Sequence, residues 1–415
     1  MRINVFLLIT SLLLVATSSV TMAQAQQPDP SNEDVRTLVS RLDLTQYKTT
    51  LEGLTQFGDR RQGTERNRQA IDWIEAQLQS VGCTTTERID YIHDPAPRNR
   101  SSRRRSQTPL NVDGPTATGK QIGRNGSGPG GSSIFGYRGA TGVNTDPKNQ
   151  PNERLRELNR EPATNGPRQE VYCTKIGRTN PGEMYIIGAH MDGHGWGEAA
   201  NDDGSGTAIV LELARIFNAP DVQTERSIRF ALWNNEETGL NGSRAYVEQR
   251  VGLQGQEVPP GSGNYPEPRW LGMVQHDMML FDHGAPRADG TVSPDQRPEA
   301  DINIEFQSTA ELAPEARALA FFFKATNDAY ATDYPATVGP HMTNTDSTPF
   351  MDLVPAISLR ENERGAHIGA GWDPHWHQPT DVFDTFTDDD FRLGLASAQT
   401  TLAAIAQLVN ATITQ

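Results

Sequence analysis

The chain has 415 residues, with 37 lysines and arginines against 52 aspartates and glutamates, and a formal net charge of −15 at pH 7. This acidity disfavours nucleic acid as a general partner and places many carboxylates within reach of a cation. The two cysteines, Cys83 and Cys173, are too few for a disulfide-rich scaffold or for a cysteine-ligated zinc site. Any metal must therefore be held by His, Asp and Glu.

The N-terminus has the pattern of a signal peptide, which we place at residues 1–25. Arg2 precedes an apolar run from Val5 to Val15, and an A-x-A stretch follows at Ala23 to Ala25. The run is shorter than the ~20 residues of a membrane span, no later segment is apolar enough to cross a bilayer, and no Cys follows it for a lipid anchor. We expect cleavage after Ala25, or alternatively after Ala23, and a secreted or periplasmic protein without stable membrane insertion.

Two segments of different character follow. Residues 32–80 have helical periodicity, and Gly82 gives a stop signal before the strand-like stretch 83–91. Residues 95–168 are rich in Pro, Gly, Ser, Asn and Arg, with eight basic residues and one acidic residue between positions 98 and 138. Because this composition cannot bury a core, we expect a disordered insertion. A tether to anionic surfaces and a protease-sensitive activation loop are the functional alternatives.

Strands and helices alternate through residues 169–415. The expected strands are 184–190, 227–233, 270–275 and 354–359, and the expected helices are 207–217, 242–250, 313–328 and 388–409. This alternation favours an α/β sandwich with a largely parallel central sheet. Ligands of such sheets gather at the carboxyl ends of the strands, and the acidic and His residues considered next lie at those ends.

The first candidate motif is "GAHMDG", in which His190 ends a strand and Asp192 follows two residues later. The Asp192 carboxylate can hold the far ring nitrogen of His190 and fix its tautomer, although the pattern is common and also fits a surface turn. The second motif is "NDDGSG", which begins at Asn201 and opens a helix. Asp202 in this turn fits a metal ligand and an ordinary helix cap equally well.

Adjacent carboxylates, Glu236 and Glu237, follow the expected strand 227–233. Such a pair is costly unless a cation lies nearby, because like charges repel. Adjacent side chains also point in different directions, so one can ligate a metal while the other acts on water. Carboxylate and imidazole ligands without thiolates fit a hydrolytic zinc site, which lowers the pKa of bound water to about 7.

Two further candidates come later in the chain. Asp277 lies at a strand end in "VQHDMML", and His377 precedes Asp381 by four residues in "WDPHWHQPTD". The other histidines are not assigned as ligands: His194, His276, His341 and His375 lie near proposed ligands, and His93, His283 and His367 are expected at the surface.

In their order along the chain, these motifs resemble the co-catalytic di-zinc exopeptidases, which include bacterial leucyl aminopeptidases, glutamate carboxypeptidases and glutaminyl cyclases. The resemblance extends to "RRQGTERNRQAIDWIEAQLQSVGC" (60–83), "EETGLNGSRAY" (236–246) and "TDSTPFMDLVPAISL" (345–359). It implies a three-layer αβα sandwich with a mixed, largely parallel sheet, and one catalytic domain formed by residues 26–94 and 169–415.

The resemblance also implies a role for each motif residue. His190 and Asp277 would hold one zinc ion, Glu237 and His377 a second, and Asp202 would bridge the two ions. Glu236 would take a proton from the bridging water and pass it to the leaving amine. Asp192 would orient His190.

Two departures from the family pattern stand out. The family usually places a Tyr, whose hydroxyl steadies the oxyanion, immediately before the last His, but here that residue is Trp376. An indole N–H donates a hydrogen bond from a different position, so the oxyanion donor is left open. The basic insertion also replaces the compact connection expected between early strands.

Among the family's activities, a zinc aminopeptidase that hydrolyses the N-terminal residues of peptides is the leading interpretation. A carboxypeptidase is the first alternative, because Arg360 or Arg364 in "LRENERGAH" offers a cation for a terminal carboxylate. A glutaminyl cyclase works with one zinc and does not need all five ligands. An inactive ectodomain is weakened by the presence of every ligand and of Glu236. The sequence leaves the oligomeric state open.

The two cysteines flank the basic insertion, each in a strand-like stretch. In an oxidising compartment they can pair and close a long loop, whereas two separate buried thiols fit the sequence equally well.

Overall fold

The computed structural model describes residues 27–94, 143–281, 302–331, 333–340, 344–361, 373 and 375–414. The expected signal peptide and residues 95–142 of the expected insertion lie outside these ranges. The helical N-terminal stretch forms α1 (Glu33–Val39), α2 (Leu44–Thr55) and α3 (Glu65–Ser80). Each begins after a side chain that accepts a hydrogen bond from a first-turn backbone N–H; these caps are Asn32, Asp43 and Thr64.

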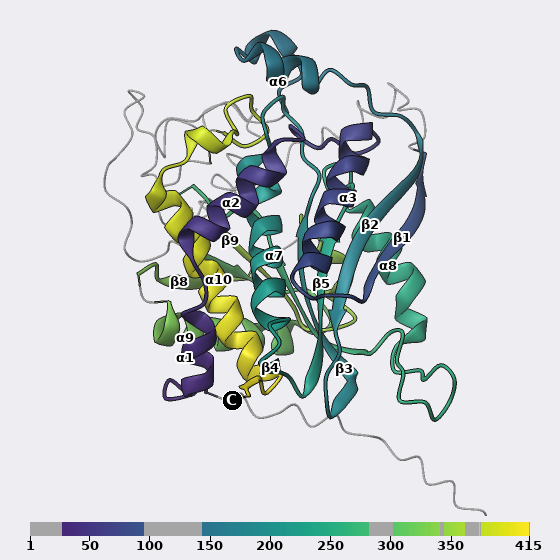
Figure 1. Ribbon diagram of the computed structural model, residues 1–415, viewed down its shortest axis with the longest axis vertical. Coiled ribbons are helices and arrows are strands. Elements are labelled where there is room, and N and C mark those ends of the chain that lie inside the picture. Colours follow the sequence, from purple (N-terminus) through teal and green to yellow (C-terminus); the bar gives the residue numbers. More distant parts are fainter. Residues whose placement is uncertain are drawn as a thin grey trace, which may run out of the picture.

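A mixed sheet lies at the centre of the described structure (Figure 1). Its eight strands are β1 (Thr86–His93), β2 (Gly166–Lys175), β3 (Asn180–His190), β5 (Arg226–Trp233), β6 (Arg269–His276), β7 (Ile302–Glu305), β8 (Ala336–Gly339) and β9 (Ala356–Glu361). They lie in the order β1-β2-β5-β3-β6-β9-β7-β8. The four central strands β5, β3, β6 and β9 run parallel, whereas β1, β2 and β7 pair antiparallel with inner neighbours.

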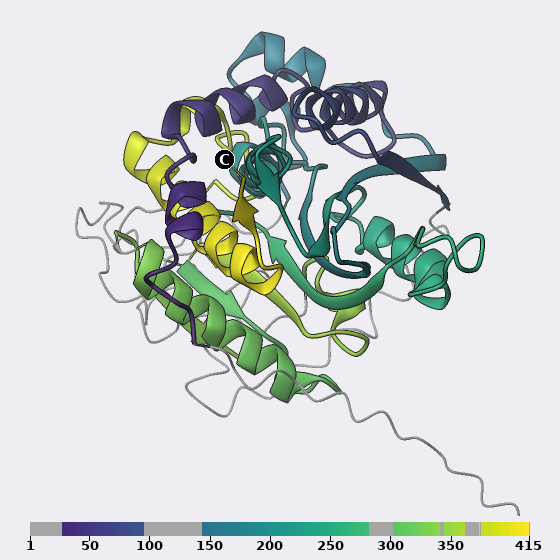
Figure 2. The same ribbon diagram turned by 60° about the horizontal axis from the view of Figure 1, so that its bottom comes forward.

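Helices cover both faces of this sheet, which confirms the expected αβα sandwich. The other α-helices of the described residues are α6 (Glu153–Leu158), α7 (Gly206–Phe217), α8 (Asn241–Arg250), α9 (Ala313–Tyr330) and α10 (Asp388–Leu408), and a small second sheet pairs β4 (Val222–Gln223) with β10 (Thr412–Ile413). Alternate residues of β3 face opposite layers: Ile187 joins the core under α7 and α10, and Ile186 joins the core under α8. Burial on both faces explains the continuous apolar run of this strand. Figure 2 shows α9 and α10 running alongside each other over the sheet.

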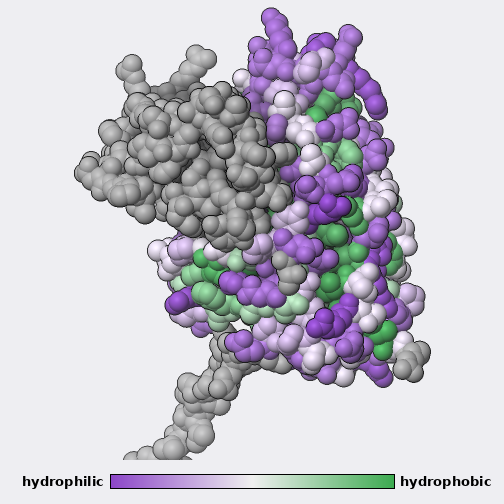
Figure 3. Space-filling model, turned by 90° about the vertical axis from the view of Figure 1, so that its left-hand side faces the viewer, coloured by the Kyte–Doolittle hydropathy of each residue, from purple (hydrophilic) through white to green (hydrophobic). Residues whose placement is uncertain are grey.

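On the side of the molecule shown in Figure 3, hydrophilic side chains predominate and apolar areas lie between them. This is the pattern expected where amphipathic helices turn their polar sides to solvent. Within the residues that the structure describes, no helix combines the length and the apolar character needed to cross a membrane.

The prediction of disorder is wrong for residues 143–168, the C-terminal part of the expected insertion. Residues 143–168 include helix α6 and the start of β2. Leu155 of α6 is buried, and the buried Asn159 donates to Gly197 O at 2.7 Å while accepting from Asp59 N at 3.1 Å. The average composition of residues 95–168 did not reveal this short helix, because a few buried apolar residues hardly change that average. The division of the chain into domains stays a prediction.

Arg60 ties the N-terminal helices to the loop after β3. It is fully buried, and its guanidinium donates to four backbone carbonyls: Met191 O at 2.8 Å, Gly58 O at 3.0 Å, Glu198 O at 2.6 Å and Ala199 O at 2.8 Å. The planar fork of Arg suits several acceptors at once. One side chain therefore fixes both ends of the segment 191–199.

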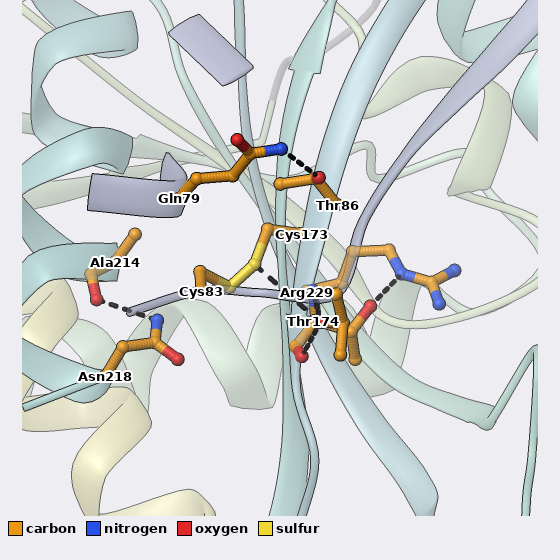
Figure 4. The surroundings of a disulfide bond; sticks show 9 residues. Gln79, Cys83, Thr86, Cys173, Thr174, Ala214, Asn218 and Arg229 are labelled. Atoms are coloured by element: carbon orange, nitrogen blue, oxygen red, sulfur yellow. Dashed lines mark hydrogen bonds between the residues drawn. A yellow bond between two sulfur atoms is a disulfide. The ribbon is translucent and has the colours of Figure 1, made fainter. Parts of the chain in front are cut away.

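The two cysteines form a disulfide between Cys83 and Cys173, which are 90 residues apart (Figure 4). The bond joins the segment after α3 to strand β2, and both cysteines are buried. Of the two alternatives left by the sequence, the structure selects the disulfide.

Replacing Arg60 with Met should lower the free energy of unfolding by at least about 3 kcal/mol, because buried carbonyls lose their donors. Chemical denaturation measures this loss. The neighbouring Arg61 provides the matched control. It is exposed to solvent, so Arg61→Met deletes a guanidinium group that is not buried. Equal stability of the two variants would contradict the assigned role of Arg60.

Replacing both cysteines with Ala should lower the free energy of unfolding by about 2–4 kcal/mol, because the unfolded chain gains the freedom of a long open loop. The wild-type protein under reducing conditions should approach the stability of this variant. Thiol titration of denatured, unreduced protein checks the bond itself, and two free thiols would refute it.

Candidate metal centre

The carboxyl ends of three neighbouring parallel strands meet at one edge of the sheet and carry the candidate residues. His190 is the last residue of β3, Asp277 follows β6 directly, and Glu236 and Glu237 lie just beyond β5. Because β5, β3 and β6 are parallel neighbours, positions far apart in sequence come together here.

One group of possible ligands consists of His190, Asp202 and Asp277, all buried. The Nε2 atom of His190 lies 3.2 Å from Asp202 Oδ1 and 3.9 Å from Asp277 Oδ1. These are the three residues that the sequence assigned to the first metal position.

A second group consists of His194, Glu237 and His377. The Oε2 atom of Glu237 lies 2.9 Å from His377 Nε2 and 3.2 Å from His194 Nε2. Glu237 and His377 were expected here, whereas His194 was not assigned as a ligand. Its only sequence signal was its position four residues after His190.

Asp202 lies between the two groups. Its Oδ1 faces His190 Nε2, and its Oδ2 lies 3.0 Å from His377 Nε2. A carboxylate that offers one oxygen to each side has the geometry of a bridging ligand. Burial opposes ionisation of Asp202, but the two imidazoles outweigh it and hold the pKa of Asp202 well below its ordinary value.

The neighbouring carboxylates shift the pKa values of the two imidazoles in the opposite direction, upward. Burial by itself lowers the pKa of His377, but Glu237 and Asp202 outweigh this effect and raise it to about 9. For His190, Glu236 and Asp202 likewise overcome burial and raise the pKa well above its ordinary value. The site is therefore a dense buried arrangement of opposite charges.

The turn that carries Asp202 is held by other buried carboxylates. Asp202 lies in an irregular turn (Ala200–Ser205) before α7, with non-helical dihedral angles at Asp202 and Asp203, and its peptide bond to Asp203 is cis. Asp381 accepts from the backbone N–H of Asn201 at 2.7 Å and of Asp202 at 3.2 Å. Asp203 accepts from His190 N at 3.1 Å and Gly206 N at 2.9 Å. The sequence did not predict that Asp381 and Asp203 hold the backbone here, because these hydrogen bonds join residues that are distant in the chain.

Asp192 contacts the site differently from the expectation. The Nδ1 atom of His190 lies 2.8 Å from the backbone oxygen of Asp192 and 3.9 Å from its carboxylate. The main chain therefore holds the His190 ring. The Asp192 carboxylate instead accepts from Glu236 N at 3.0 Å, and burial raises the pKa of Asp192 to about 6. Asp192 thus positions the segment that carries Glu236 and Glu237.

Arg360, which the sequence offered as a cation for a terminal carboxylate, lies on the central strand β9. Its side chain is fully buried, and its Nη2 contacts Asp277 Oδ2. The other oxygen of Asp277 faces His190. Every residue of β9 is buried, and Arg360 shares this burial. Arg364 lies outside the described residues.

The donor set fits divalent metal ions of the zinc type. It contains imidazole and carboxylate groups only, as expected for a hydrolytic zinc site. Several of its buried atoms have no hydrogen-bond partner within the described part of the chain: Asp202 Oδ2, Glu237 Oε1, Asp277 Oδ1, His194 Nε2 and His377 Nε2. Buried polar atoms normally have partners, and a bound cation would supply them.

The remaining described histidines lie apart from these groups. His276 contacts Ser397 and Thr401 of α10, and burial lowers its pKa to about 3. His375 contacts Thr380 at 2.8 Å. Trp376 stacks on His377, with ring centroids 3.8 Å apart. His283, His341 and His367 lie outside the described residues.

Known proteins share both the sequence pattern and the fold. LpqL of Mycobacterium tuberculosis, described as a probable lipoprotein aminopeptidase, is 44% identical over 82 residues, which are 20% of this chain and 16% of LpqL. The zinc aminopeptidase BSAP from Bacillus subtilis superposes with a TM-score of 0.54 at 14% identity, covering 89% of this chain and 95% of BSAP. Glutaminyl cyclase from Porphyromonas gingivalis superposes with a TM-score of 0.51 at 14% identity, covering 89% and 99%.

The two solved structures show a shared fold, and the curated relative matches over a small part of its length. A family model matches far more of the chain, from residue 172 to residue 394, and this region contains every candidate ligand. With more than half of its residues matched, the chain belongs to peptidase family M28.

Proposed function

We propose that this chain is a secreted or periplasmic zinc-dependent aminopeptidase with two zinc ions. The observation that carries the proposal is the pair of donor groups that share Asp202. Glu236 precedes the donor Glu237 in the chain, and its backbone is held by Asp192. The disulfide between Cys83 and Cys173 supports a compartment outside the cytoplasm, where such bonds persist.

The donor groups assign each ligand a position. His190 and Asp277 would hold one ion, Glu237 and His377 the other, and Asp202 would face both. Zinc bound here would lower the pKa of water to about 7 and polarise the scissile carbonyl. Arg360 occupies Asp277 Oδ2 and leaves Oδ1 directed toward His190, which favours ligation through a single oxygen.

Glu236 is proposed as the general base. It follows Asn235, whose positive φ turns the chain sharply beyond β5, and its backbone N–H is fixed by Asp192. Burial lowers the pKa of His190, and the Glu236 carboxylate has the largest of the effects that raise it, as expected for a charge near this donor group. A carboxylate so placed can accept a proton from water and return it to the leaving amine.

Cleavage from the N-terminus is favoured by the charges of the site. A carboxypeptidase must place a cation against the terminal carboxylate of its substrate. Arg360 does not offer one, because it is buried in β9 against Asp277. The carboxylates around the site instead complement a free α-ammonium group. A glutaminyl cyclase is a weaker alternative, since one zinc would not need both donor groups.

Purified protein should contain about two zinc ions per chain, and chelators should abolish peptide hydrolysis. Glu236→Gln should keep this metal content and lose at least about 100-fold in kcat, since it removes a base and no ligand. Elemental analysis and initial rates measure the two properties. Glu237→Gln should lose metal, and the exposed Glu248→Gln should behave as wild type. Near-normal kcat for Glu236→Gln would exclude the assigned role.

Polarity is tested with three substrates: leucyl-p-nitroanilide, its N-acetylated form, and a dipeptide blocked at its N-terminus but free at its C-terminus. An aminopeptidase should hydrolyse only the first, because the other two lack the α-ammonium group. Hydrolysis of the blocked dipeptide alone would reverse the assignment to carboxypeptidase.

A further inference from the structure

The second donor group contains one more side chain than the family resemblance supplies. His194 lies four residues after His190 in the loop beyond β3, with only 14% of its side chain exposed. Its Nε2 is 3.2 Å from Glu237 Oε2, and its ring meets that of His377 nearly at right angles, with centroids 4.1 Å apart. The three residues thus offer donor atoms within 4.8 Å of one another.

The orientation of these atoms distinguishes ligands from a hydrogen-bonded cluster. The Nε2 atoms of both His194 and His377 are buried and close to Glu237 Oε2. Neither forms an aligned hydrogen bond with a described residue. A ring N–H that held Glu237 would point along the line to its oxygen. Both nitrogens instead lie close enough to Glu237 Oε2 for the three residues to hold one ion.

The backbone around His194 allows this close approach. A Cβ on Gly193 would lie 2.4 Å from the Ala199 side chain and 2.9 Å from Asp202 O. A Cβ on Gly195 would lie 2.3 Å from the backbone carbon of His377, and the φ of Gly195 is +105°. The absence of both side chains lets the loop pack against the backbones of two proposed ligands. Arg60 fixes the same loop at Met191 and Ala199.

We propose that His194 is a further protein ligand at the second metal position, an inference that rests on the proposed two-metal function. That position then has four protein donors, namely His194, Asp202, Glu237 and His377, whereas the first position has His190, Asp202 and Asp277. The ion with four donors is bound more tightly and exchanges more slowly. The ion with three keeps more of its coordination sphere for substrate.

Metal-free wild-type protein titrated with Co²⁺ against a competing chelator should bind two ions with unequal affinity. His194→Ala should weaken the tighter site at least about tenfold, as the loss of even an outer-shell partner of a ligand does. The weaker site should change little. His93→Ala removes an imidazole from the edge strand β1 and should leave both affinities unchanged.

Proton NMR of the Co²⁺-loaded protein separates a ligand from a residue that only supports Glu237. Each ligating imidazole retains one ring N–H whose signal is shifted strongly by the bound Co²⁺. Wild-type protein should show three such signals, from His190, His194 and His377, and His194→Ala should show two. Two signals in wild type, or unchanged affinities in the variant, would overturn the proposal. Wild-type protein that binds a single ion would instead overturn the two-metal function itself.

Discussion

The structure depends on the burial of opposite charges around Asp202. One carboxylate faces two imidazoles, and each imidazole faces a second carboxylate, all with little access to water. Such groups are costly to bury unless each has a compensating partner. The sheet provides the meeting point, because its parallel central strands deliver their polar carboxyl ends to the same edge.

The surrounding chain holds these charges through the backbone more than through the side chains themselves. Asp381 accepts N–H groups of the turn that carries Asp202, Asp203 accepts the N–H of His190, and Asp192 accepts the N–H of Glu236. Arg60 satisfies carbonyls of the loop that carries His194. Fixed backbones place the donor atoms without using their lone pairs, so those lone pairs are left for a cation.

The fold does not select the reaction. Similar folds occur in a zinc aminopeptidase and in a glutaminyl cyclase, at low sequence identity to this chain. The distinction lies in the side chains at the sheet edge: how many donors each metal position has, and whether a cation faces the substrate. The burial of Arg360 against Asp277 bears directly on the second question, because it removes one candidate anchor for a terminal carboxylate.

The sequence by itself determined the fold class and the candidate ligands His190, Asp202, Glu237, Asp277 and His377, which meet at the site. Apolar runs that end at His190 or shortly before Glu236 and Asp277 identify buried strands with polar residues at their ends, and local composition suffices for that. Only the tertiary structure placed His194 beside Glu237, turned the Asp192 carboxylate toward Glu236 and buried Arg360. It also packed α6 where composition indicated disorder and joined Cys83 to Cys173. Each of these outcomes depends on which loop or strand lies opposite, and spacing along the chain carries no information about that.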